Sequence, residues 1–168
     1  MTDETATAAA AGETAQPQRT VALRKIYVKD MSFESPMAPQ IFTASELKPT
    51  SNLNLRSTHR KLEDQPIYEM VLTLTLDSKV GDDTVFLVEL HQAGLFQIEG
   101  FNDAEAAQIL GTFCPTTLFP YAREVISSAV LRGGFPEFLL QPIDFDGLWA
   151  RSQAEQAAAA QQAAGETH

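Results

Sequence analysis

A chain of 168 residues with 44% hydrophobic content is long enough for one domain with a real core and leaves little room for a second. The formal charge of -10, with no lysine after Lys79, argues against a nucleic-acid partner, because phosphate neutralisation needs clusters of Lys and Arg. The single Cys114 excludes an internal disulfide and is typical of a reducing compartment. With neither a secretion signal nor a membrane-spanning run in the sequence, we expect a cytoplasmic protein.

The N-terminal residues 1–20 are rich in Ala, Thr, Gln and Glu and show no periodic apolar face. They bury too little to offset the entropy of ordering, so we predict a disordered tail. From Val21 onward, LRKIYVKDMSF has the near alternation of a half-exposed strand. Pro36 and Pro39 then predict a loop, followed by a second strand at about residues 52–62.

The third predicted strand, IYEMVLTLTLDS, is the clearest element of the sequence. Its alternation places an apolar row toward the core, with Glu69, Thr73, Thr75 and Asp77 on the other face. That apolar row consists of Tyr68, Met70, Leu72, Leu74 and Leu76.

A fourth strand, TVFLVELHQ, follows a turn at residues 80–83, which favours an antiparallel hairpin with the third strand. Its first half is apolar on both faces, because Val85 and Leu87 alternate with Phe86 and Val88. We therefore expect another subunit or a partner to cover part of the second face.

Helices are predicted for the second half of the chain. Asn102 and Glu105 form a capping-box pattern before a helix that ends at Gly111. A longer helix begins at Pro115 or restarts at Pro120 and stops at the glycine pair 133–134. Its apolar stripe comprises Leu118, Ala122, Val125, Ile126, Ala129 and Val130.

The C-terminal part of the chain begins with FPEFLLQP, which is predicted to be extended because Pro136 and Pro142 bracket it. Asp144 is expected to cap a last helix that runs to about residue 160. The folded domain is therefore predicted over residues 21–160, with a second disordered tail over 161–168.

Residues 110–138 form a dense apolar segment that holds five of the fourteen aromatic side chains. The sequence offers no convincing catalytic set: Cys114 is more simply a small buried hydrophobe than a nucleophile paired with a histidine. No Cys or His pair has metal-ligand spacing, and no glycine-rich loop joins a strand to a helix start. These features indicate binding rather than enzymatic chemistry, without a cofactor or metal.

Acidic residues alternate along the first strand, which would place Asp30, Ser32 and Glu34 on one face. Glu89, close to Leu87 on the fourth strand, could lie beside that face. A solvated strand face is the more common reason for such alternation, and a binding role is the alternative. Acidic and apolar groups together could engage a basic, amphipathic partner.

Three segments carry a resemblance to a known family: RKIYVKDMSFESPMAP, VFLVELHQAGLFQIEG and LGTFCPTTLFPYAREVISSAVLRGGFPEFLLQPIDFDGL. In order and spacing they resemble the bacterial protein-export chaperone SecB family, over about residues 23–149. The resemblance implies an α+β fold, a four-stranded antiparallel sheet followed by helices, that assembles as a dimer of dimers and hence a homotetramer. No ATP or cofactor is implied.

The function implied is that of a holdase, which keeps secretory precursors unfolded in the cytosol and delivers them to the SecA ATPase of the Sec translocase. The implied contact with the basic, zinc-binding C-terminal tail of SecA falls on Asp30, Ser32, Glu34, Leu87 and Glu89. The zinc belongs to SecA. A SecB-like chaperone dedicated to one client, such as an antitoxin, is the alternative.

The resemblance also implies client binding near the extended segment and the last helix. The candidates are large apolar side chains that could equally serve core packing: Phe135, Phe138, Leu139, Leu140, Phe145, Leu148 and Trp149.

Overall fold

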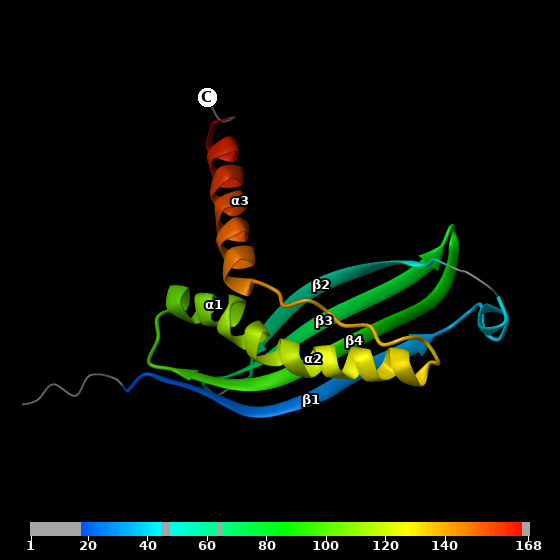
Figure 1. Ribbon diagram of the computed structural model, residues 1–168. Helices are drawn as coiled ribbons and strands as arrows, with labels where there is room; N and C mark the ends of the chain where they lie inside the picture. The colour runs from blue at the N-terminus through cyan, green and yellow to red at the C-terminus, as the bar shows by residue number, and fades with distance from the viewer. Residues whose placement is uncertain (1–17, 45–47, 64, 166–168) are drawn as a thin grey trace, which may run out of the picture.

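The computed structural model describes residues 18–44, 48–63 and 65–165, with side chains described as far as residue 161 (Figure 1). Of the N-terminal tail predicted over residues 1–20, residues 1–17 lie outside the described part of the chain. Within it, the fold is an antiparallel sheet with helices after it, as predicted from the sequence.

Four strands form the sheet in the spatial order β1-β4-β3-β2, and every neighbouring pair is antiparallel. The strands are β1 (Thr20–Glu34), β2 (Thr50–Lys61), β3 (Ile67–Val80) and β4 (Asp83–Glu99). A short 3₁₀ turn, η1 (Gln40–Phe42), lies in the predicted loop after β1. Because β1 pairs with β4, two segments about sixty residues apart in sequence lie side by side.

The hairpin of β3 and β4 confirms the predicted pairing, with Gly81 at a φ of 60° in its turn. Only glycine adopts such a left-handed conformation without strain. The predicted core row of β3 is buried from Met70 to Leu76, and Tyr68 is partly buried against it. These residues face α2, so this side is the inner face of the sheet.

β4 continues to Glu99, seven residues beyond the predicted end of TVFLVELHQ. The Ala93-Gly94 pair conceals this continuation in the sequence, because glycine ordinarily weakens a strand. In the structure, a Cβ at Gly94 would lie 2.8 Å from Cδ2 of Leu118 on the helix above. Gly94 therefore permits the close packing of helix on sheet rather than ending the strand.

The start of β4 also departs from simple alternation. A register shift opposite Ser78 and Lys79 leaves Val85 without a direct partner on β3. Val85 and Phe86 are consequently both buried in the core. The irregular register thus explains, within a single chain, why apolar residues occupy both alternating rows at the start of β4. It does not cover Leu87, which is only half-buried.

Three helices follow the sheet: α1 (Asp103–Gly111), α2 (Phe113–Arg132) and α3 (Phe145–Gly165). The predicted capping box is present, because Asn102 accepts from the Glu105 amide at 2.9 Å and Glu105 accepts from the Asn102 amide at 3.1 Å. α2 is one continuous helix that starts at Phe113, before both predicted starts, and it contains Pro120 in its first half. Most of its predicted apolar stripe is buried against the sheet.

Gly134, at a φ of 86°, follows the end of α2 and turns the chain back. Residues 135–144 form no regular secondary structure and run back along the sheet to α3 (Figure 1). The Asp144 carboxylate accepts from the Gly147 amide at 2.9 Å, which confirms its expected capping role. α3 projects away from the sheet and extends to Gly165, past its predicted end near residue 160. None of the described helices has the length and hydrophobicity to cross a membrane.

Candidate functional site

The outer face of the sheet, opposite α2, brings together the alternating acidic residues of β1 and the neighbouring positions of β4. Ser32 pairs with Glu89, and Glu34 pairs with Leu87, in the β1-β4 register. Residues opposite each other in antiparallel strands project from the same face. The structure therefore places five predicted residues in one patch, which we call the acidic patch: Asp30, Ser32, Glu34, Leu87 and Glu89.

The three β1 members of the acidic patch are exposed, and Leu87 and Glu89 on β4 are half-buried. His91 pairs with Asp30 across the strands, and its Nε2 lies 3.0 Å from Oε1 of Glu89. The patch thus offers accessible carboxylates around an apolar side chain. Alternation along the fourth strand predicts that His91 shares a row with Glu89, and the structure adds the direct contact between their side chains.

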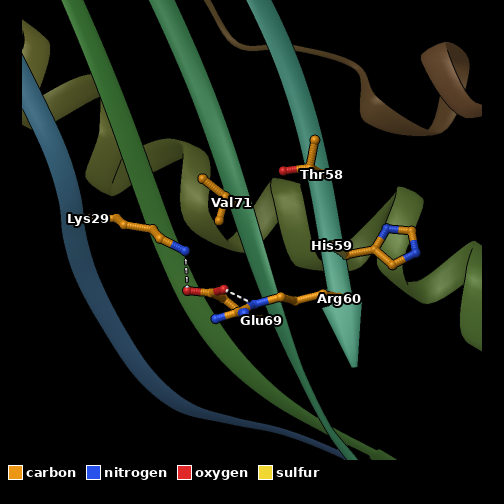
Figure 2. Close-up of a pocket in the computed structure, with 6 residues that line it drawn as sticks. All are labelled: Lys29, Thr58, His59, Arg60, Glu69 and Val71. Atoms are coloured by element: carbon orange, nitrogen blue, oxygen red, sulfur yellow. Dashed lines mark hydrogen bonds and ion pairs between the residues drawn. The ribbon is translucent and has the colours of Figure 1, made fainter. Parts of the chain in front are cut away.

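A second feature of the outer face is a charge network around Glu69, shown in Figure 2. The Glu69 carboxylate accepts from Lys29 Nζ at 2.8 Å, from Arg60 Nε at 2.6 Å and from the Tyr27 hydroxyl. Its side chain is only 5% exposed. The predicted face for Glu69 is correct, but long side chains from β1 and β2 cover it, so it is not solvated.

The hydrogen bonds of the network control its ionisation. Donation from Lys29 and Tyr27 lowers the pKa of Glu69 from 4.5 to about 2, against the opposing effect of burial. Burial, together with the bond to Glu69, raises the pKa of Tyr27 to about 12. At neutral pH Glu69 is therefore a buried carboxylate whose charge is matched by Lys29 and Arg60.

The region around α3 contains a hollow of about 330 Å³ between the edge strand β2 and the helices. Its lining residues are Leu55, Ser57, His59, Leu110, Gly111, Phe145, Leu148, Trp149 and Ser152. The Trp149 ring packs directly on Gly111, where an added Cβ would lie 2.1 Å from the ring. Three of the seven predicted client-binding residues, Phe145, Leu148 and Trp149, thus line one hollow. The residues that β2 contributes to the hollow were not predicted, because only the tertiary fold brings β2 next to α3.

The remaining client candidates differ in exposure. Leu139 is 64% exposed, whereas Leu140 is 4% exposed and belongs to the core. Phe135 and Phe138 are half-buried. Phe135 lies within an aromatic group, with ring centroids 4.9 Å from Phe86 and 5.3 Å from Phe42. Phe145 is also buried in the core, with only part of its surface reaching the hollow.

The chemistry available in the described part of the chain is that of binding. Cys114 is fully buried, and burial raises the pKa of its thiol to about 12, so it stays protonated at neutral pH. Among the residues that the structure describes, no group of three or more His, Cys, Asp and Glu side chains could hold a metal ion.

Comparison with known proteins identifies close relatives. A family model described as Preprotein translocase subunit SecB matches residues 14–156. The Protein-export protein SecB of Idiomarina loihiensis is 48% identical over 162 residues, which cover 96% of both chains. The protein of the same name from Hahella chejuensis is 47% identical over 153 residues, 89% of this chain and 95% of the relative.

One solved structure shares the fold at low sequence identity. A SecB-like chaperone of Mycobacterium tuberculosis, in complex with a ChAD peptide from the HigA1 antitoxin, superposes with a TM-score of 0.62 at 16% identity. The match covers 74% of this chain and 91% of that one. At this identity the likeness shows the fold alone.

Proposed function

The chain belongs to the SecB family, and on this premise we propose that it is an ATP-independent export chaperone of the cytoplasm. It keeps secretory precursors unfolded and delivers them to SecA. The observation that carries the proposal is the meeting of β1 and β4 in the acidic patch, because two distant segments supply the five residues that the family resemblance assigns to SecA.

The acidic patch suits a basic, zinc-binding tail by charge complementarity. Exposed carboxylates steer a cationic segment and fix its register, and the half-buried Leu87 supplies an apolar anchor beside them. Zinc is part of that partner, so this chain needs no cofactor for docking.

The docking role is tested by Asp30→Ala combined with Glu89→Ala, measured by calorimetry against the SecA tail peptide. We expect at least about tenfold weaker docking, or about 1.4 kcal/mol, with client binding unchanged. The matched control is Asp82→Ala with Glu155→Ala, which removes the same charge from exposed sites outside the patch. Equal weakening in both variants would show that net charge, rather than the patch, governs docking.

Client binding is proposed for the hollow beside Trp149 and the exposed chain that leads to it. Leu139 and Leu148 are exposed, and Trp149 is partly so, so an unfolded chain can reach them without unfolding the chaperone. Several weak apolar contacts along one client multiply through effective concentration and need little sequence preference. Binding to the unfolded state delays folding by mass action, so hydrolysis is not required.

Trp149 is the only tryptophan, so its fluorescence reports directly on the hollow. We expect an unfolded precursor to change the Trp149 emission and to refold more slowly in the presence of the protein. A folded precursor should do neither. An unchanged emission together with unimpeded refolding would reject the chaperone function itself.

Assembly as a dimer of dimers is proposed from apolar side chains that the single chain leaves exposed. They lie on the free edge strand β1 and at exposed positions of α2: Leu23, Val28, Met31, Phe113, Tyr121 and Leu131. Contacts between copies would cover them. Native mass spectrometry should find a mass near four times 18.4 kDa, and a monomer would contradict the assembly.

A chaperone dedicated to an antitoxin is the second candidate. The antitoxin-bound neighbour is 16% identical, whereas the export proteins are 47–48% identical over most of the chain, which favours export. A pull-down from native cells dominated by one antitoxin, rather than by many precursors, would reverse this preference.

A further inference from the structure

The outer face carries a second hollowed region that adjoins the acidic patch and shares Glu89 with it. Two adjoining hollows, of about 390 and about 410 Å³, share Lys29, Thr58 and Val71. The first also contacts Arg60 and Glu69, as Figure 2 shows. The second hollow is completed by Arg56, Thr73, Glu89 and His91. We call the surface of Lys29, Arg56, Thr58, Arg60 and Thr73 the basic trough.

The basic trough combines residues of three strands. Arg56, Thr58 and Arg60 alternate along β2 and therefore project from the same face. Thr73 pairs with Arg56, and Glu69 pairs with Arg60, in the β2-β3 register. With a rise of about 3.4 Å per residue, the two arginines lie about 14 Å apart along the strand.

The buried Glu69 orders the cations of the trough before any ligand arrives. It engages Lys29 Nζ and Arg60 Nε at 2.8 and 2.6 Å. A lysine carries three donors and an arginine five, so both retain donors for a further acceptor. The Arg60 side chain stays 69% exposed while it makes this contact, so the ordered guanidinium remains accessible.

The charges of the network also leave an excess of positive charge. Glu69 balances one of the two cations that it binds. Glu89, 3.0 Å from His91, contributes a second negative charge, because a histidine neutralises it only when protonated. Arg56 makes no ion pair within the described residues. The lining of the two hollows therefore holds three cations against two carboxylates, an excess of one positive charge on a chain whose net charge is -10.

We propose that the basic trough binds an extended acidic peptide segment of a partner protein. Carboxylates at alternate positions of an extended chain face one side, so positions i and i+4 span about 14 Å and match Arg56 and Arg60. The hydroxyls of Thr58 and Thr73 and the apolar Val71 suit the intervening backbone and side chains. A long polyanion such as nucleic acid would instead run onto the carboxylates of the adjacent acidic patch.

The test uses the full chain and a fluorescein-labelled peptide of alternating Glu and Thr, measured by fluorescence anisotropy. We expect binding of this peptide, and none of the same peptide with Gln in place of Glu. Arg56→Gln, which leaves the Glu69 network intact, should weaken binding about fivefold, and Arg56→Gln with Arg60→Gln at least about tenfold. Circular dichroism checks that each variant is folded.

The matched control is Lys48→Gln with Arg151→Gln, which removes the same charge from exposed positions elsewhere. It should retain affinity within about twofold. The proposal is overturned by equal loss in the control, by equal binding of the Gln peptide, or by full displacement with inorganic phosphate at matched ionic strength. Because no SecA peptide takes part, failure here is distinct from failure of the acidic-patch docking.

Discussion

Strand β2 contributes to two regions that differ in kind. Its residues Arg56 and Arg60 face the charged outer side of the sheet, whereas Leu55 and Ser57 line the hollow beside Trp149. His59 lines hollows on both sides. Because successive side chains of a strand point to opposite faces, this one strand contributes to a polar surface on one face of the sheet and to a largely apolar hollow on the other. A chaperone of this design can hold a client on one side and engage a delivery partner on the other.

The two regions also differ in the physics of recognition. The outer face offers charges held in a defined order by strand register, which favours a particular partner and weakens with salt. The hollow offers apolar surface without a fixed pattern of donors, which suits many clients.

The largest effect is expected from a pair of adjacent leucines. Leu140→Ala removes a core side chain and should lower the free energy of unfolding by about 2–5 kcal/mol in denaturant titrations. Leu139→Ala, at an exposed position, should change stability little but weaken client binding. If both variants were equally destabilised, Leu139 would be packing rather than client surface.

Glu69→Gln should lower the free energy of unfolding by about 1–3 kcal/mol at neutral pH, because the ionised partner of Lys29 and Arg60 is lost. The folded state lowers the pKa of Glu69 from 4.5 to about 2, so its stabilisation is complete above pH about 4.5 and disappears as pH falls toward 2. The stability difference between wild type and variant should therefore shrink over that range in acid titrations. A difference independent of pH would mean that packing, not charge, is responsible.

Ionic strength should affect binding at the two regions differently, with a smaller effect than the substitutions above. Raising ionic strength from about 0.05 M to about 0.5 M shortens the screening length and should weaken docking on the acidic patch about tenfold. Client binding at the Trp149 hollow should hold or strengthen, because apolar burial is not screened. Calorimetry with each ligand at both salt concentrations gives the comparison, and parallel losses would remove the distinction.

Local patterns in the sequence predicted the elements that local physics determines. The alternation of β3 and the capping box at Asn102 and Glu105 involve residues within a few positions of each other, and both are confirmed. The end of β4 was missed because Gly94 has a role that only Leu118, on a distant helix, makes visible. Similarly, the burial of Glu69 depends on Lys29 and Arg60 from other strands.

The candidate sites show the same contrast between local patterns, which the sequence predicts, and tertiary contacts, which it does not. Alternation predicted that Asp30, Ser32 and Glu34 share a face and that Glu89, close to Leu87, could lie beside it. The family resemblance assigned these residues to one contact, and the β1-β4 register places them side by side. The client candidates could not be sorted from sequence, because Leu139 and Leu140 are identical residues with opposite burial. The β2 wall of the hollow had no sequence signal that linked it to Trp149.

The most direct test of two separate regions is simultaneous binding, measured by native mass spectrometry with an unfolded precursor and the SecA tail peptide. We expect a complex whose mass is four times 18.4 kDa plus the masses of both ligands, bound at once. Asp30→Ala with Glu89→Ala should remove the peptide and leave the precursor bound. Mutual exclusion of the two ligands, or their joint loss in the variant, would contradict the presence of two separate regions.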